Sequence, residues 1–105
     1  MSTGDLGGLF QQAQKMQKEL KAVQEDLKQR TVLGESGSGL VKVYANGQQE
    51  VLKVEIDPKV VDPEDIEMLE DLLLVAVGQA LEKAKELSDQ ETSRVTGGMS
   101  FPGMT

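Results

Sequence analysis

The sequence predicts an α+β fold in which a long N-terminal helix, a small antiparallel sheet of about three strands and a long C-terminal helix follow one another. Three observations predict it. Apolar residues recur at helical intervals in the first quarter of the chain, an Asn-Gly pair separates two β-like segments, and Asp62-Pro63 opens a second helical segment. A chain of 105 residues is the size of one domain.

The N-terminal helix is predicted from a regular stripe of apolar residues. These residues are separated alternately by three and four positions: Leu6, Leu9, Ala13, Met16, Leu20, Val23 and Leu27. Such spacing is typical of a helix face that packs against another element. Gly7 and Gly8 weaken the first turn, so we expect the helix to run from about residue 9 to residue 30. The stripe fits packing within the subunit and packing between subunits equally well.

The sheet is predicted from β-branched segments separated by turn residues. Thr31 begins the first segment, the Gly-rich stretch 34–39 breaks the chain, and a strand at 40–45 precedes Asn46-Gly47. Asn-Gly favours a two-residue hairpin turn, which would place Val41 opposite Leu52 and Val43 opposite Glu50. One face then collects the apolar side chains Val41, Val43, Ala45, Leu52, Val54 and Ile56. A sheet with one apolar face requires a helical cover.

The second helix is expected from residue 63 to about residue 91, with Asp62 as its N-cap and Pro63 at its first position. Such a helix spans about 43 Å, whereas a compact domain of this size has a radius of gyration of about 13 Å. Residues 72–77 are apolar on every side of the helix, which indicates burial all round. We therefore predict an elongated subunit that forms a homodimer through Leu69, Leu72, Leu73, Val75, Ala76 and Val77. Residues 1–96 form the single domain, and residues 97–105 are predicted to be a flexible tail.

The composition argues against catalysis. The chain contains no Cys and no His, which removes disulfides, thiolate metal sites and the usual proton shuttle at neutral pH. We expect no enzyme activity, no cofactor and no metal. The longest apolar run, 72–77, is far shorter than the ~20 residues of a membrane span, and the N-terminus lacks the features of a signal peptide. We expect a cytoplasmic protein that does not enter a membrane.

Charge is distributed unevenly along the chain, which carries a net charge of −7. Residues 1–30 have a net charge of +1, whereas residues 57–92 carry eleven acidic residues against three lysines, a net charge of −8. Basic residues form two small groups, Lys15, Lys18 and Lys21 on the first helix and Lys83, Lys85 and Arg94 on or beyond the second. The two groups would share a tip if the early part of the first helix lay beside the late part of the second. They are otherwise ordinary solvated residues.

Two other patterns favour structural explanations. The stretch 34–39 is rich in glycine, but it is followed by a strand and contains Glu35, unlike a phosphate-binding loop. It is better explained as a connection between strands. The acidic cluster at 62–71 lacks calcium-loop spacing and is typical of a helix N-terminus.

Several motifs together resemble a known family. They are Gly34-Glu35-Ser36-Gly37, Asn46-Gly47, Val54-Glu55-Ile56-Asp57-Pro58, Met68-Leu69-Glu70-Asp71-Leu72, and Gly98-Met99 with Pro102-Gly103. This set, which extends over nearly the whole chain, resembles the YbaB/EbfC family of bacterial nucleoid-associated DNA-binding proteins. The resemblance implies a tweezers-like homodimer with projecting helical arms that binds DNA in the nucleoid and affects its organisation and gene expression.

The expected function combines this resemblance with the basic groups. DNA would be bound through phosphates at the arm tips by Lys15, Lys18, Lys21, Lys83, Lys85 and Arg94, with little dependence on base sequence. The alternative is a protein-interaction or adaptor dimer with weak or no DNA binding, which the acidic segment 57–92 and the Met- and Phe-containing tail favour.

Overall fold

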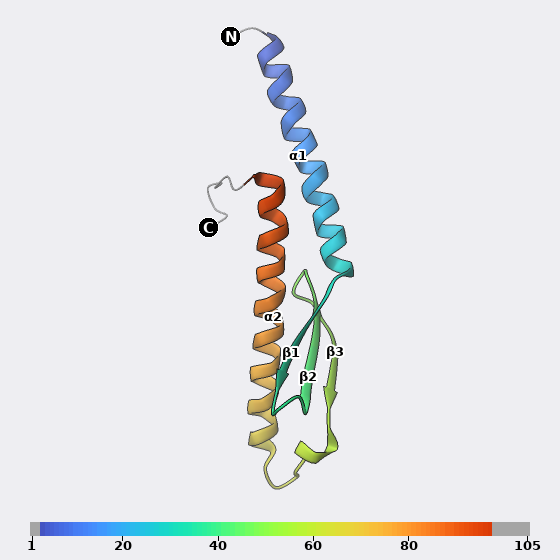
Figure 1. Cartoon of the computed structure of the whole chain (residues 1–105), viewed down its shortest axis with the longest axis vertical. Helices are drawn as coiled ribbons and strands as arrows, with labels where there is room; N and C mark the ends of the chain where they lie inside the picture. Colours follow the sequence, from blue (N-terminus) through green and yellow to red (C-terminus); the bar gives the residue numbers. More distant parts are fainter. Residues whose placement is uncertain (1–2, 98–105) are drawn as a thin grey trace.

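The computed structural model of the chain describes residues 3–97 and confirms the predicted α+β fold (Figure 1). The elements, in order, are α1 (Thr3–Gln29), β1 (Thr31–Ser36), β2 (Val41–Asn46), β3 (Val51–Ile56), the 3-10 helix η1 (Pro58–Val60) and α2 (Ile66–Thr96). From residue 98 onward the predicted tail lies outside the described residues.

The molecule is elongated, with extents of 74 × 23 × 17 Å and a radius of gyration of 20.0 Å. The sheet covers the N-terminal part of α2, and the C-terminal part of α2 lies beside the lower part of α1 (Figure 1). The two helices run in opposite directions, and the N-terminal part of α1 extends past the end of α2. We call the sheet with α2 the body and the projecting residues 3–18 of α1 the arm.

Both helices differ from their predicted bounds at their ends. α1 begins at Thr3 rather than near residue 9, because Gly7 and Gly8 cost helical stability, about 1 kcal/mol each relative to Ala, without stopping the helix. α2 begins later than predicted: Asp65 is its N-cap, and its side chain accepts a hydrogen bond from Met68 N at 3.2 Å. The Asp62 carboxylate instead accepts from Glu64 N at 3.0 Å and forms a local turn. At its other end α2 continues to Thr96, where Gly97 adopts φ 63°.

The sheet has the order β1-β2-β3 and is antiparallel throughout. The predicted hairpin register is wrong by four residues, since Val41 pairs with Ile56 and Val43 with Val54. The connection is longer because the Asn46 side chain accepts hydrogen bonds from Gln48 N and Glu50 N at 2.9 and 3.1 Å. From Val41 to Tyr44 the shift is even, which preserves the predicted apolar and polar faces. A β-bulge between Tyr44 and Ala45 then pairs Ala45 with Val51, so the predicted alternation is interrupted next to the turn.

The core lies between β2 and α2. Val41, Val43 and Ala45 of β2 are fully buried against Ala76 and Ala80 of α2. Close approach also depends on a glycine in β1: a Cβ at Gly34 would lie 2.9 Å from the Ala80 Cβ and collide with the Ala76 carbonyl oxygen. By contrast, the apolar side chains on the inner face of β3 are exposed, because α2 packs against β1 and β2. They are Leu52, Val54 and Ile56.

Candidate nucleic-acid interface

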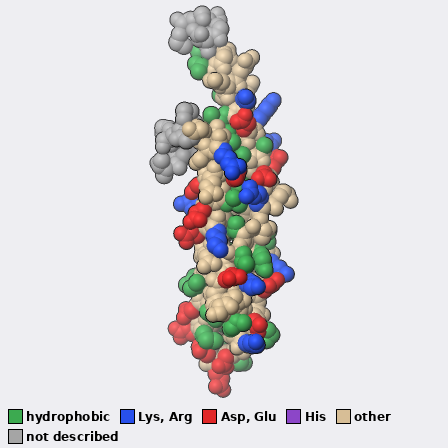
Figure 2. Space-filling model, viewed as in Figure 1, with side chains coloured by type: hydrophobic (Ala, Val, Ile, Leu, Met, Phe, Trp, Pro, Cys, Tyr) green, Lys and Arg blue, Asp and Glu red, His purple; other side chains and the backbone are tan. Residues whose placement is uncertain are grey.

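The charged residues are divided between the two ends of the molecule. Segment 6–18 of the arm carries Lys15 and Lys18 and no acidic residue. Segment 62–82, around the start of α2, has no basic residue and seven acidic ones: Asp62, Glu64, Asp65, Glu67, Glu70, Asp71 and Glu82. Figure 2 shows acidic side chains gathered at the end of the body farthest from the arm. The protein is therefore acidic overall and basic locally.

The arm and its continuation present a face of lysine and glutamine. Lys15, Lys18 and Lys21 are all exposed. Gln14, Gln17, Lys18 and Lys21 line a shallow surface concavity of about 430 Å³. Ammonium groups and side-chain amides both donate hydrogen bonds, and both are common partners of nucleic-acid phosphates. The predicted stripe of three lysines thus lies on one exposed helix face.

The second predicted basic group does not join the first at a common tip. Lys83 and Lys85 lie alongside the sheet, where the Lys83 ammonium donates a hydrogen bond to the Leu33 carbonyl oxygen at 2.8 Å. The contact between Arg30 and Glu91 fixes the offset of the two helices. At 1.5 Å per residue, Lys83 lies about 12 Å to one side of that contact and Lys18 about 18 Å to the other. The expectation of a shared tip is therefore wrong for the lysines of α2.

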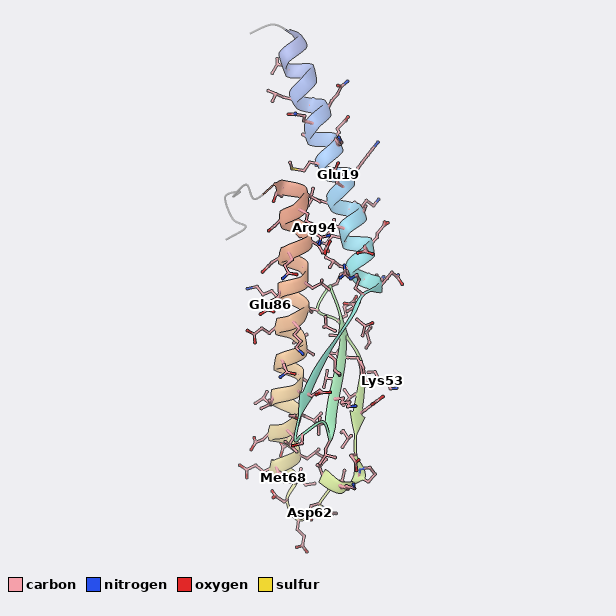
Figure 3. The ribbon with its side chains drawn as sticks, viewed as in Figure 1. Glu19, Lys53, Asp62, Met68, Glu86 and Arg94 are labelled. Carbon is pink, nitrogen blue, oxygen red and sulfur yellow. The ribbon has the colours of Figure 1, made fainter. Side chains whose placement is uncertain are left out.

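Arg94 lies nearer to the arm, close to the C-terminal end of α2, whereas Glu19 on α1 lies just beyond that end (Figure 3). The Arg94 guanidinium contacts the Glu91 carboxylate at 3.4 Å and remains largely exposed. Of the second basic group, only Arg94 is thus positioned at the base of the arm.

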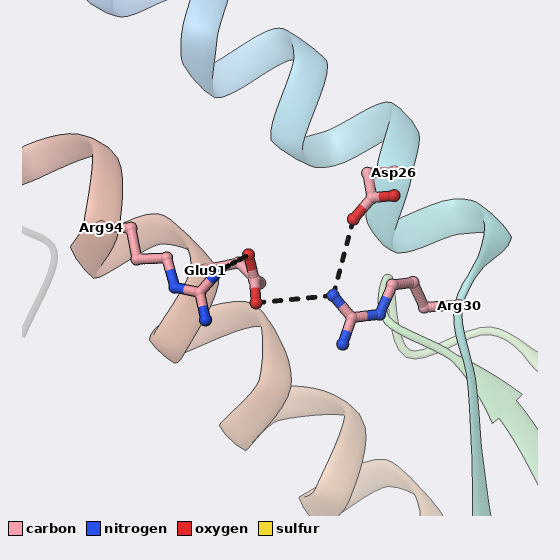
Figure 4. Close-up of polar contacts among 4 residues, drawn as sticks. All are labelled: Asp26, Arg30, Glu91 and Arg94. Carbon is pink, nitrogen blue, oxygen red and sulfur yellow. Dashed lines mark hydrogen bonds and ion pairs between the residues drawn. The ribbon is translucent and has the colours of Figure 1, made fainter.

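A small ion cluster joins α1 to α2 at this base. The Glu91 carboxylate lies between Arg30 and Arg94, each with a nitrogen at 3.4 Å, and its side chain is only 14% exposed. Arg30 also contacts Asp26 of α1 at 3.6 Å (Figure 4). Sequence reasoning missed this cluster because Arg30 and Glu91 are separated by 61 positions, and a local charge pattern carries no information about such pairs.

The β2–β3 connection forms a second attachment of α1. Gly47 N donates to the carbonyl oxygens of Leu27 and Arg30 at 2.8 and 3.1 Å, and Gln48 Nε2 donates to Gln24 O at 2.7 Å. The Leu27 carbonyl is one of the last four of α1, which have no partner four residues on within the helix, and it accepts from Arg30 N at 3.2 Å as well as from Gly47 N. A Cβ at Gly47 would lie 2.7 to 2.9 Å from Leu27 atoms. The direction of the arm is thus set by close backbone contact.

The residues predicted for dimer contact lie in three environments. Ala76 is fully buried beneath the subunit's own sheet. Leu69, Leu72, Leu73 and Val77 are half-buried against the same core. Val75 is 58% exposed, and its neighbour Leu74, which sequence reasoning did not select, is 73% exposed. The apolar ring at 72–77 is therefore covered on one side within the subunit and open on the other.

The structure also tests the motifs for which structural explanations were favoured. The stretch 34–39 forms the end of β1 and the turn to β2, as predicted. Within residues 3–97, no three potential metal-ligating side chains gather. No helix in this part of the chain is long and apolar enough to cross a membrane. On the outer face of β3, a hydrogen bond from Lys53 at 2.9 Å lowers the pKa of the exposed Glu55 carboxyl.

The fold and its charges define a class of protein, an acidic α+β body that carries a projecting helical arm with exposed lysines. The chain belongs to the YbaB/EbfC DNA-binding family, whose family model matches residues 2–99. This membership agrees with the resemblance inferred from the sequence motifs.

Two relatives and one solved structure illustrate the similarity. A protein of Caldanaerobacter subterraneus named as a nucleoid-associated protein is 48% identical over 95% of this chain and 90% of its own length. Another with that name, from Pelotomaculum thermopropionicum, is 45% identical over 99% of both chains. A crystal structure of an uncharacterised Helicobacter pylori protein is 28% identical, with a TM-score of 0.75 over 92% of this chain and 99% of the other.

Proposed function

We propose that this protein is a nucleoid-associated DNA-binding protein of the cytoplasm that acts by binding rather than by catalysis. The observation that carries the proposal is the exposed lysine and glutamine face of α1, at the opposite end of a 74 Å molecule from its acidic cluster. DNA is bound through its phosphates with little dependence on base sequence. Binding of this kind affects nucleoid organisation and, through it, gene expression.

A net charge of −7 opposes DNA binding, because DNA is also negatively charged. The acidic residues, however, lie far from the lysines of α1. Along the helix axes, the start of α2 lies about 55 Å from Lys18. The Debye length at physiological ionic strength is about 8 Å. Repulsion between the acidic end and DNA at the arm is therefore strongly screened, and the charges nearest the lysine face determine whether DNA can approach.

The six basic residues contribute unequally in this proposal. Lys15, Lys18 and Lys21 make the main phosphate contacts, and Arg94 adds a contact at the base of the arm. Lys83 and Lys85 contribute only when the duplex continues along the body toward the sheet. DNA-binding affinity should therefore respond most to substitutions in α1.

A salt titration of DNA binding tests this proposal. We expect log affinity to fall against log salt by about 0.9 for each phosphate neutralised. Replacing Lys15, Lys18 and Lys21 together by Gln should weaken binding and reduce that slope. The matched control replaces Lys42, Lys53 and Lys59 by Gln, which changes the net charge equally but on the body. Equal effects of the two triple variants, or no binding by the wild-type protein, would contradict the proposal.

The proposal includes a homodimer, because the body leaves apolar side chains uncovered. Leu74 and Val75 on α2 are exposed, as are Leu52, Val54 and Ile56 on β3. A partner subunit would cover Val75 together with the outer parts of Leu69, Leu72, Leu73 and Val77, while Ala76 supports the surface from within. Two subunits also present two basic arms, and double attachment strengthens binding without a new contact.

Light scattering on a Val75→Lys variant tests this interface. A charge in an apolar contact should separate the subunits, because an unpaired buried ammonium is costly. Gln90→Lys adds the same charge at another exposed position of α2 and should leave the dimer intact. A Val75→Lys protein that remains a dimer would exclude this surface.

The acidic end favours one alternative, a protein-interaction or adaptor dimer. Its seven acidic residues between 62 and 82 suit a basic protein partner better than DNA. The same salt titration separates the two functions, because an adaptor shows little DNA binding at any salt concentration.

A further inference from the structure

The apolar stripe of α1 continues beyond the helix that covers it. Leu27 is fully buried, and Val23, Leu20 and Met16 are half-buried. Farther along the arm, Leu9 and Leu6 are 59% and 54% exposed, and the adjacent Phe10 is 68% exposed. α2 ends at Thr96, so nothing among residues 3–97 covers the outer part of the stripe. The same helix face that packs against α2 is thus left open near its tip.

The exposed stripe lies on the opposite side of the arm from the lysines. Nine residues, or two and a half helical turns, separate Leu9 from Lys18, so their side chains point in opposite directions. A duplex held by the lysine face leaves Leu6 and Leu9 uncovered. The occupant of the stripe is therefore different from the DNA that the lysines bind.

The sequence of the arm indicates what kind of partner fits. Alternating intervals of three and four residues favour packing against another α-helix. Segment 6–14 contains no charged residue, and Gln11, Gln12 and Gln14 occupy its polar positions. Two copies of this segment can approach each other without repulsion between like charges. A basic or acidic partner helix would find no opposite charge in this segment with which to form ion pairs.

We propose that the arm of a second molecule packs against this stripe, through Leu6 and Leu9 of each copy. The second arm packs against the same face of α1 that α2 covers nearer the body. The contact therefore extends the packing between α1 and α2 toward the tip of the arm. It rests on the proposed function in one respect: each arm binds DNA on its lysine face, so two paired arms join two DNA segments.

The contact is small and is expected to be weak in free solution. Two large apolar side chains per arm bury much less than the ~1,600 Å² of a standard stable interface. Molecules that bind neighbouring sites on DNA have a high effective concentration, which compensates for weak individual affinity. Pairing of arms should therefore appear mainly as cooperative binding and as bridging between duplexes.

The first experiment separates bridging from binding. In the test variant, Leu6 and Leu9 are replaced by Gln, and the control replaces both by Met, which keeps the stripe apolar. In the Val75→Lys background, where the body interface cannot join two arms, affinity for a duplex that accommodates one molecule is compared with capture of a free duplex by a bead-bound duplex. We expect unchanged affinity for the short duplex and a loss of bridging of roughly tenfold or more for the Gln variant alone.

The other outcomes are equally decisive. Unchanged bridging by the Gln variant overturns the pairing of arms. Reduced affinity for the short duplex would show that the stripe itself contacts DNA, as an apolar wedge between bases does, and would also overturn it. Failure of the wild-type protein to bind the short duplex contradicts the proposed function instead.

A cross-linking experiment tests the pairing without DNA. The chain has no Cys, so a single Ala13→Cys substitution places one thiol on the stripe, and Gln11→Cys places one on the opposite side of the arm. A flexible bis-maleimide at high protein concentration should link Ala13→Cys chains and leave Gln11→Cys chains largely unlinked. Linking should persist in the Val75→Lys background, which separates this contact from the body interface. Equal linking of both cysteine variants would contradict the proposal.

Discussion

The body is closely packed, whereas the arm is an exposed stretch of a single helix. In the body, positions such as Gly34 allow backbone and side chains to meet at contact distance around fully buried Val41 and Val43. In the arm, α1 has open space around it, and Gly7 and Gly8 have no neighbour within 4 Å. Close packing thus specifies the body, whereas exposed charge and apolar surface determine what the arm can bind. Substitutions in the body should therefore change stability, and substitutions in the arm should change binding.

The largest expected effect is on the packing of α2 against β1. Gly34→Ala places a Cβ into the Ala76 carbonyl and 2.9 Å from the Ala80 Cβ, so α2 must move away from the sheet. Overpacking of this kind costs about 1–3 kcal/mol or more, and we expect the upper end because the neighbours are backbone atoms. The urea-unfolding midpoint measures the loss.

Gly7→Ala on α1 is the matched control, at an exposed helix position away from the surface of α2 that is proposed for the dimer. No atom lies within 4 Å of its added Cβ, and Ala favours a helix interior over Gly by about 1 kcal/mol. This variant should be as stable as the wild-type protein or more stable. If both glycine variants lose stability equally, close approach at Gly34 does not explain the fold of the body.

The next effect concerns the attachment of the arm to the body. Gly47→Ala brings a Cβ within 2.7 to 2.9 Å of Leu27 and should displace the C-terminal end of α1, at a cost of about 1–2 kcal/mol. Hydrogen exchange should increase at the amides of α1 and remain unchanged at those of β2. An equal increase in exchange at the amides of α1 and β2 would show that Gly47→Ala destabilises the core as well as the attachment of the arm.

The ion cluster at the base of the arm should have a smaller effect. Glu91→Gln removes the charge that lies between Arg30 and Arg94, and partly exposed ion pairs contribute about 0.5–1 kcal/mol. The loss of unfolding free energy should shrink at high salt because such pairs are screened. Glu86→Gln, at an exposed position of the same helix, should change stability less. If Glu91→Gln and Glu86→Gln lose the same unfolding free energy, the ion cluster does not stabilise the fold.

The sequence was sufficient to predict elements that depend on local pattern. Helical spacing identified α1, and alternation of apolar residues identified the buried face of β2. The register of the hairpin was not predictable from Asn46-Gly47 because two contacts override the local turn preference. The Asn46 side chain holds Gln48 N and Glu50 N, and Gly47 N donates to α1.

The candidate interface was predictable only to the extent that it lies on one helix. Lys15, Lys18 and Lys21 share a face because of helical periodicity alone. The position of Lys83 relative to them depends on the offset between α1 and α2, which the contacts of Glu91 with Arg30 and of Gly47 with Leu27 determine. Such an offset arises from packing between distant segments, and no local sequence pattern records it.

The smallest effect is predicted on the outer face of the sheet, far from both the core and the arm. The hydrogen bond from Lys53 lowers the pKa of the Glu55 carboxyl, and Glu55 raises the pKa of Lys53 in return. Since the pKa of Glu55 is lower in the folded state, its contribution to stability is present above the unfolded pKa near 4.5 and is lost as pH falls through the folded value. In the Lys53→Gln variant, the NMR-measured pKa of Glu55 should rise toward 4.5. A pKa of Glu55 that does not move would show that Lys53 is not its main partner.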